Sequence, residues 1–258
     1  EHAAVALAQA QRNQAQQDVA ALYRRFQASL SPTVTVESPH LKVATCYRPG
    51  EGRMLLGGAF IDAVTRPNGS VAAVIGDVTG HGPDAAALGS SLRAAWRALA
   101  LRGASLQASM KTLNSLTLDE SDRAEQGELG LGLLATVCAV EIDAAGRRAR
   151  FVHAGHPMPL LLGQDVAQVA HTPGMMLGVE QYGDWPPHEI TLPADWGLLL
   201  FSDGIVEART GDAHDRLGVD GLRAALAGLW RRRATSSADL QSLVDAVQAG
   251  RPDALADD

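Results

Sequence analysis

Apolar residues are spaced differently near the start of the chain and in the rest of it. In the first region they recur every three or four residues, at Val19, Leu22, Phe26 and Leu30. This spacing predicts a helix with one apolar stripe, which ends at Ser31-Pro32 because proline disfavours helical backbone in the residue before it. From Leu41 onward, short apolar runs alternate with turn residues. We therefore expect a helical segment over residues 1–35 and one folded domain over residues 36–258.

The N-terminal helix fits two arrangements. Residues 1–30 contain no Gly or Pro and are rich in Ala and Gln, which is typical of a linker or coiled-coil helix that follows an upstream module. The same helix fits equally as the first helix of its own domain. The chain begins with Glu1 rather than Met, so we expect it to have been cut from a longer protein.

Two hairpins are predicted within the domain. The first joins residues 60–65 to residues 71–77 through Pro67-Asn68-Gly69, because Asn-Gly readily adopts the positive φ angles of tight turns. The second joins residues 133–142 to residues 148–153. Further short strands are expected at residues 41–47, 159–162, 189–192 and 198–202.

Helices are predicted in two pairs. The first pair follows the first hairpin and starts at Pro83, since proline suits the first helical position. Its apolar stripes are Leu88, Leu92, Ala95, Trp96 and Leu99 in one helix, and Leu106, Met110, Leu113 and Leu116 in the other. The second pair covers residues 219–229 and 237–249. Because strands come in blocks and do not alternate with helices, the pattern favours an α+β fold with antiparallel sheets.

Composition and charge narrow the range of functions. Hydrophobic residues make up 46% of the chain, enough for a sizeable core, and the net charge of -7 disfavours nucleic acid as a partner. We interpret Arg231-Arg232-Arg233 as the solvated end of a helix. No apolar run reaches the ~18 residues of a membrane-spanning helix, and no signal peptide is recognisable. Cys46 and Cys138 show no disulfide pattern, so we expect both in the core of a cytoplasmic protein.

Three acidic positions are candidates for chemistry. Asp77 follows an apolar strand and opens a glycine-rich turn that reads Gly-Asp-Val-Thr-Gly-His-Gly over residues 76–82. Asp203 follows a second apolar strand in Phe-Ser-Asp-Gly, and Asp257-Asp258 ends the chain. Carboxylates and backbone carbonyls are the hard oxygen ligands of Mg²⁺ and Mn²⁺. Two such ions activate a water and clamp a phosphoryl group, and Asp77 is our candidate to bridge them.

Five blocks in order resemble the motifs of one bacterial family. They read RMLLGGAFIDAV, VIGDVTGHGPDAAALGSSLRAAWRAL, LATVCAVEID, ARFVHAGHPMPLLL and GLLLFSDGIVEAR. Over residues 40–258 they resemble the SpoIIE/RsbU-type domain of the PPM (PP2C-like) serine/threonine phosphatases. The resemblance implies an αββα sandwich with a two-metal centre between two antiparallel sheets. It also implies hydrolysis of phosphoserine or phosphothreonine by a water that two Mn²⁺ or Mg²⁺ ions activate, with no covalent phosphoenzyme.

The resemblance also assigns metal ligands and partners. Asp77 resembles the bridging ligand, the Val78 carbonyl a second ligand, Asp203 a third, and Asp257 the first Asp of a late motif that precedes a final strand. That strand is missing from this sequence, which stops where a core strand should begin: either the chain is cut there or further residues follow Asp258. The implied substrate is a phosphorylated anti-anti-sigma (STAS-type) protein in sigma-factor signalling. An upstream sensor or receiver domain is implied too, with a homodimer formed through the N-terminal helix.

One position departs from the family pattern. The early motif normally reads Gly-Gly-Asp, two residues and Asp, whereas this chain has Ala59 in place of the first Asp and retains Asp62. Alanine cannot ligate a metal ion. The chain is therefore an engineered inactive variant, a natural pseudophosphatase that binds without catalysis, or an enzyme with a weakened metal site.

Two histidines and one glutamate lie near these motifs. His81 and His156 sit in Gly-His-Gly and Gly-His-Pro, and each is either a proton donor to the leaving serine oxygen or a residue that shapes its turn. We interpret Glu207 as a loop residue.

Overall fold

The structure is a computed structural model, and it describes residues 14, 34, 36–48, 57–125, 132–208, 216–232 and 236–249. The predicted helical stripe at Val19–Leu30 and the predicted ligand Asp257 lie outside these residues.

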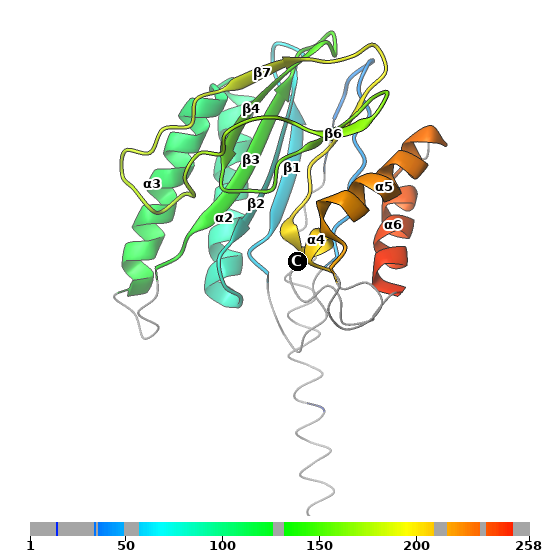
Figure 1. Cartoon of the computed structure of the whole chain (residues 1–258). Helices are drawn as coiled ribbons and strands as arrows, with labels where there is room; N and C mark the ends of the chain where they lie inside the picture. The colour runs from blue at the N-terminus through cyan, green and yellow to red at the C-terminus, as the bar shows by residue number, and fades with distance from the viewer. Residues whose placement is uncertain are drawn as a thin grey trace, which may run out of the picture.

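Two antiparallel sheets form the centre of the molecule (Figure 1). The large sheet has the order β1-β2-β3-β4-β7, with β1 at Phe60–Thr65, β2 at Val71–Val78, β3 at Ala135–Ile142, β4 at Arg148–Ala154 and β7 at His188–Thr191. The small sheet has the order β6-β5-β8, with β5 at Leu160–Leu162, β6 at Val166–Gln168 and β8 at Gly197–Leu199. Every neighbouring pair of strands in both sheets runs antiparallel.

Helices cover the outer faces of both sheets. The helices of the large sheet are α2 at Pro83–Leu101 and α3 at Leu106–Glu125. Those on the side of the small sheet are α4 at Asp203–Glu207, α5 at Gly218–Arg231 and α6 at Ser237–Ala249. Figure 1 shows α2 and α3 on one side of the sheets and α5 and α6 on the other.

The alternation of side chains along the strands builds the layers. On β2, Val74 and Val78 pack with Trp96 of α2, whereas Ala73 faces the other way and packs near Phe151 of β4. Leu161 of the small sheet joins this second cluster. Because successive side chains of a strand point to opposite faces, one core lies between the large sheet and its helices and another between the sheets. The predicted αββα sandwich is confirmed.

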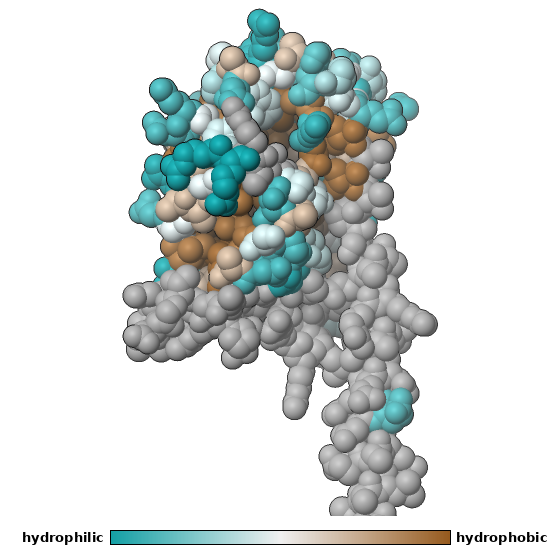
Figure 2. All heavy atoms as spheres, turned by 90° about the vertical axis from the view of Figure 1, so that its right-hand side faces the viewer, coloured by the Kyte–Doolittle hydropathy of each residue, from teal (hydrophilic) through white to brown (hydrophobic). Residues whose placement is uncertain are grey.

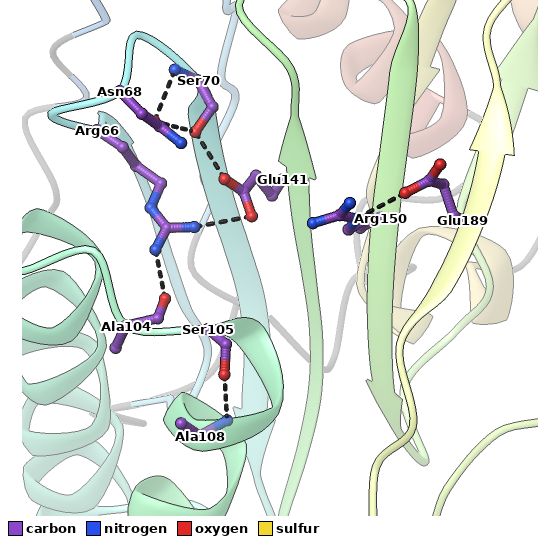
Figure 3. Close-up of polar contacts among 9 residues, drawn as sticks. All are labelled: Arg66, Asn68, Ser70, Ala104, Ser105, Ala108, Glu141, Arg150 and Glu189. Atoms are coloured by element: carbon purple, nitrogen blue, oxygen red, sulfur yellow. Dashed lines mark hydrogen bonds and ion pairs between the residues drawn. The ribbon is translucent and has the colours of Figure 1, made fainter.

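The predicted hairpins and long helices are confirmed. Gly69 has a φ of 79° in the β1–β2 turn, a conformation that favours glycine. At this end of the sheet Arg66 donates to the Ala104 carbonyl and pairs with Glu141 at 2.8 Å, as Figure 3 shows. The Ser70 hydroxyl donates to Glu141 at 2.7 Å.

Some predicted elements were wrong or missing. Residues 41–47 form no strand, and no described strand pairs with them. The Thr45 amide donates to the Ser237 hydroxyl at 3.2 Å. Cys46 is only half-buried there, whereas Cys138 is buried in β3 as expected. The three-residue strand β6 and the five-residue helix α4 were not predicted, because elements this short leave no periodic signal.

The surface on the side of α5 and α6 is mixed. Figure 2 shows hydrophilic side chains there, interrupted by patches of apolar ones. Arg232 is exposed just after the end of α5, as expected for the basic cluster. Among the described residues, no helix is both long and apolar enough to cross a membrane.

Candidate metal centre

Asp77 lies at the end of β2 on the face that points toward the small sheet. Its neighbours Gly76 and Val78 belong to the opposite face, where Val78 joins the core beneath α2. In the ladder Asp77 stands opposite Thr136 of β3, and its side chain is half-buried. The strand therefore delivers one carboxylate to the space between the sheets, at the lower end of the large sheet in Figure 1.

Glycines let three backbone segments meet beside this carboxylate. A Cβ on Gly58 would lie 2.7 Å from the Val78 carbonyl oxygen, and one on Gly89 of α2 would lie 2.4 Å from the Gly58 carbonyl oxygen. No side chain fits at such distances, so both glycines are required for the approach. The contact places the Gly57-Gly58-Ala59 segment directly against the Asp77-Val78 end of β2.

Ala59 occupies the position opposite Asp77. The β1–β2 ladder pairs Phe60 with Gly76, so the next step of the register brings Ala59 to Asp77. Residues directly opposite on antiparallel strands point to the same face of a sheet. A carboxylate at position 59 would thus stand beside Asp77, whereas the alanine offers only a methyl group.

Asp62 does not replace the missing carboxylate. It lies three residues after Ala59 on an extended segment, and therefore points to the opposite face of the sheet. There it is buried, accepts a hydrogen bond from Arg97 at 2.6 Å and lies 3.7 Å from Arg93. Asp62 ties β1 to α2 and is not turned toward the space between the sheets.

Asp203 lies shortly after β8, the last strand of the small sheet. After β8 the chain passes through buried Phe201 and extended Ser202, and Asp203 begins α4. Its side chain is exposed. Figure 1 shows α4 at the same lower end of the molecule as the turn between β2 and α2. Glu207, expected in a loop, is the last residue of α4 and pairs with Arg216 at 2.9 Å.

His156 lies beside the β3 partner of Asp77. Its Nδ1 shares a 2.9 Å hydrogen bond with the Thr136 hydroxyl, and Thr136 is the ladder partner of Asp77. The backbone of Phe201, two residues before Asp203, lies close enough to the ring to favour its protonation. Sequence reasoning did not single out Thr136, because a threonine within a strand carries no functional signal.

The environment of His156 argues against its role as a proton donor. Burial, assisted by the nearby His153, lowers the pKa of His156 to about 3, so the ring is neutral near pH 7. Only 3% of the residue is exposed. His81, the other candidate donor, is exposed after Gly80, and its backbone bridges to Gly57. Of the two, only His81 is accessible to a substrate.

The oxygen donors at this end fit a hard divalent ion in type but not in number. Asp77, the Val78 carbonyl and Asp203 carry oxygen atoms of the kind that Mg²⁺ and Mn²⁺ prefer. Within the part of the chain that the structure describes, no three His, Cys, Asp or Glu side chains group closely enough to hold a metal ion. Ala59 accounts for one missing carboxylate, and Asp257 lies outside the described residues.

Solved structures with a similar fold include phosphatase domains. The RsbU and RsbW domains of Rv1364c from Mycobacterium tuberculosis match with a TM-score of 0.58 and 23% identity, over 80% of this chain and 54% of that one. The PP2C phosphatase domain with a regulatory fragment of SpoIIE from Bacillus subtilis matches with a TM-score of 0.64 and 19% identity, over 81% and 58%. RsbX in complex with magnesium matches with a TM-score of 0.55 and 13% identity, over 79% and 85%.

The chain therefore spans little more than half of the first two matching chains. These likenesses support the PP2C-like arrangement of two antiparallel sheets with flanking helices. A family model described as Stage II sporulation protein E (SpoIIE) matches residues 67–258, which is most of the sequence. The order of the sequence motifs, the αββα sandwich and this match lead to one conclusion: the chain belongs to the SpoIIE family, with a domain of the PP2C-like SpoIIE/RsbU type.

Proposed function

We propose that this chain is the catalytic domain of a metal-dependent protein serine/threonine phosphatase whose metal site is weakened by Ala59. The observation that carries the proposal is the placement of Asp77 at the end of β2, where the register of the β1–β2 ladder brings Ala59 beside it. Family membership supports the reaction class. The domain boundary near residue 36 is part of the same proposal.

Each residue of the candidate site has a proposed role. Asp77, the Val78 carbonyl, Asp203 and Asp257 would hold Mn²⁺ or Mg²⁺, which when bound activates water and neutralises phosphate charge. Gly80 and Gly82 have φ angles of 86° and 105°, and no described atom lies within 4 Å of the place where their side chains would be. The turn after Asp77 therefore leaves open space at these two glycines, which we propose admits a phosphorylated segment.

The proposed substrate is a phosphorylated anti-anti-sigma protein of the STAS type. The support comes from two solved structures with a similar fold. One contains RsbU and RsbW domains, and the other belongs to a description of the bacterial stressosome. We further propose that residues 1–35 link the domain to an upstream sensor or receiver domain and form a homodimer. Light scattering on the full chain and on residues 36–258 tests this, since a monomer in both would refute it.

The second candidate function is a binding module without catalysis. Ala59 faces Asp77 across the ladder, and Asp62 is turned to the helix side, so the described residues offer no substitute for the lost carboxylate. In this reading the domain recognises a phosphoprotein and does not hydrolyse it. Restoring the carboxylate separates the two readings, because an otherwise intact site should regain activity.

Hydrolysis of p-nitrophenyl phosphate with Mn²⁺ tests the proposed function. We expect slow turnover by this chain, faster turnover by Ala59→Asp, and loss of both on Asp77→Asn or Asp203→Asn. Asp165→Asn is the matched control, since Asp165 is an exposed acid in the turn between β5 and β6. No hydrolysis by the Ala59→Asp protein would overturn the phosphatase proposal and leave the binding module.

A further inference from the structure

The connection between β6 and β7, residues 169–187, is held to α3 by one buried amide side chain. Asn114 of α3 is 1% exposed, and Figure 1 shows the connection beside this helix. The Asn114 Oδ1 accepts the Gly178 amide at 2.9 Å, and its Nδ2 donates to the Glu180 carbonyl at 2.8 Å. A single side chain therefore satisfies a backbone donor and a backbone acceptor of a segment that forms no strand of its own.

The backbone at Gly178 leaves no room for a side chain. A Cβ there would lie 2.8 Å from the Thr117 methyl group and 2.9 Å from the Leu133 carbonyl oxygen, and the φ angle of 88° also favours glycine. The connection thus packs directly against α3 and against the residues that lead into β3.

Leu177, the residue before Gly178, joins the connection to the first residue of β3. Its amide donates to the Ala135 carbonyl at 2.8 Å, and its carbonyl accepts the Ala135 amide at 3.1 Å, which makes one rung of an antiparallel ladder. On its other side Ala135 is the ladder partner of Val78. The connection therefore extends the large sheet at the end that carries the candidate metal centre.

The residue before Ala135 continues these contacts into the turn between β2 and α2. The Thr79 amide donates to the Leu134 carbonyl at 2.8 Å, and the Thr79 hydroxyl accepts the Leu134 amide at 3.0 Å. Hydrogen bonds between neighbouring segments thus lead from Asn114 through the connection and the start of β3 to the turn that follows Asp77.

We propose that Asn114 is a positioning residue, which holds the turn after Asp77 through these hydrogen bonds. The turn contains Gly80 and Gly82, and glycine adds freedom to a backbone, so its place depends on the bonds that Thr79 makes. The consequence for a metal ion rests on the proposed function, whereas the tie between Asn114 and the turn does not.

Residue-resolved hydrogen exchange on the protein without metal tests the tie by itself. Asn114→Ala should speed exchange of the Gly178, Leu177 and Thr79 amides by about fivefold, the change that one lost hydrogen bond produces. Thr117→Val is the matched control, because Thr117 lies on the same helix against the same glycine and its hydroxyl bonds only to the Leu113 carbonyl of α3. An unchanged Thr79 amide in Asn114→Ala, or equal acceleration in Thr117→Val, would overturn the proposal.

The same tie can be cut from its other end at an exposed residue. Thr79→Val keeps the shape of the side chain and removes the oxygen that accepts the Leu134 amide. Because coupling between two places is reciprocal, exchange of the Gly178 amide should become faster in this variant as well. This variant decides the matter if Asn114→Ala does not fold, and an unchanged Gly178 amide would count against the tie.

Mn²⁺ affinity separates a positioning role from a purely stabilising one. In the Ala59→Asp protein, Asn114→Ala should weaken Mn²⁺ binding about fivefold, while turnover of p-nitrophenyl phosphate at saturating Mn²⁺ stays the same because the ligands are intact. Thr117→Val should leave the affinity unchanged. Unchanged affinity in Asn114→Ala would overturn the positioning role. If the Ala59→Asp protein itself binds no Mn²⁺, the proposed function fails, while exchange at Thr79 still decides the tie.

Discussion

The two ends of the large sheet are built for different purposes. At the hairpin end, Arg66 is buried, pairs with Glu141 at 2.8 Å and donates to the Ala104 carbonyl, while Ser70 donates to the same glutamate. At the other end, Asp77 meets the exposed turn of residues 79–81, and Ala59 stands where a carboxylate would face it. The first end joins Arg66, Glu141 and Ser70 to one another, as Figure 3 shows, whereas the second places a half-buried carboxylate beside an exposed turn.

This contrast teaches where stability and function reside in one sheet. A buried polar network adds rigidity, and removing one member leaves its partners buried without their hydrogen bonds. A ligand site instead needs polar groups that a ligand can reach, and Asp77 is half-buried next to exposed residues 79–81. Substitutions at the hairpin end should therefore lower stability, and substitutions at the site end should lower activity with little effect on stability.

The largest expected effect is at the hairpin end. Arg66→Ala leaves the Glu141 carboxylate without its cation in a largely buried place, and should lower the free energy of unfolding by about 3–5 kcal/mol. Urea denaturation measures it. Arg150→Ala is the control, since the Arg150–Glu189 pair in Figure 3 is exposed and should contribute under about 1 kcal/mol. Equal losses in the two variants would contradict the comparison.

The next effect concerns the site end. Asp77→Asn in the Ala59→Asp protein should reduce Mn²⁺-dependent hydrolysis by about 100-fold or more, because an amide is a poorer ligand than a carboxylate. The free energy of unfolding without metal should change by less than about 1 kcal/mol, since Asp77 is only half-buried. A loss of unfolding free energy as large as that of Arg66→Ala would contradict this, because Asp77 would then stabilise the fold.

A smaller effect follows from the buried histidine. The pKa of His156 is about 3 in the folded protein and about 6.5 when unfolded, so the unfolded chain takes up a proton first as the pH falls. Stability should be fully present above pH 6.5 and should drop by about 2 kcal/mol at pH 5 through this residue alone. Urea denaturation at pH 7 and pH 5 should show a weaker dependence in His156→Asn. An unchanged dependence would mean that His156 is protonated in the folded state.

The smallest effect concerns Asp62. Asp62→Asn keeps the shape but weakens the contacts to Arg97 and Arg93, and should lower the free energy of unfolding by about 1.5 kcal/mol. Asp119→Asn, at an exposed pair with Arg123, is the control and should change little. Mn²⁺ affinity should stay the same in Asp62→Asn. A clear loss of affinity would place Asp62 at the metal after all.

Sequence reasoning reached most of the fold and only part of the site. Asn68-Gly69 and the apolar stripe around Leu92 identified a hairpin and a helix because both signals are local. The strand prediction for residues 41–47 was wrong because an apolar run in the sequence does not show whether a neighbouring strand is available to pair with it. The bond between Thr136 and His156 was not predictable, since it joins residues 20 apart through the tertiary fold.

The orientation of Asp62 could be predicted from its spacing to Ala59 along the strand. Ala59 and Asp62 are three residues apart, and in an extended strand such residues face opposite ways. The period of two therefore implied that Asp62 does not replace the missing carboxylate, and the Arg97 contact agrees with it.

Calorimetric titration of Mn²⁺ into this chain and into Ala59→Asp tests the central claim most directly. Position 59 lies beside Asp77, so the restored carboxylate should raise Mn²⁺ affinity by about tenfold or more, and adding Asp77→Asn should remove the gain. Identical titrations of the two proteins would contradict the account, because residue 59 would then not border the metal centre.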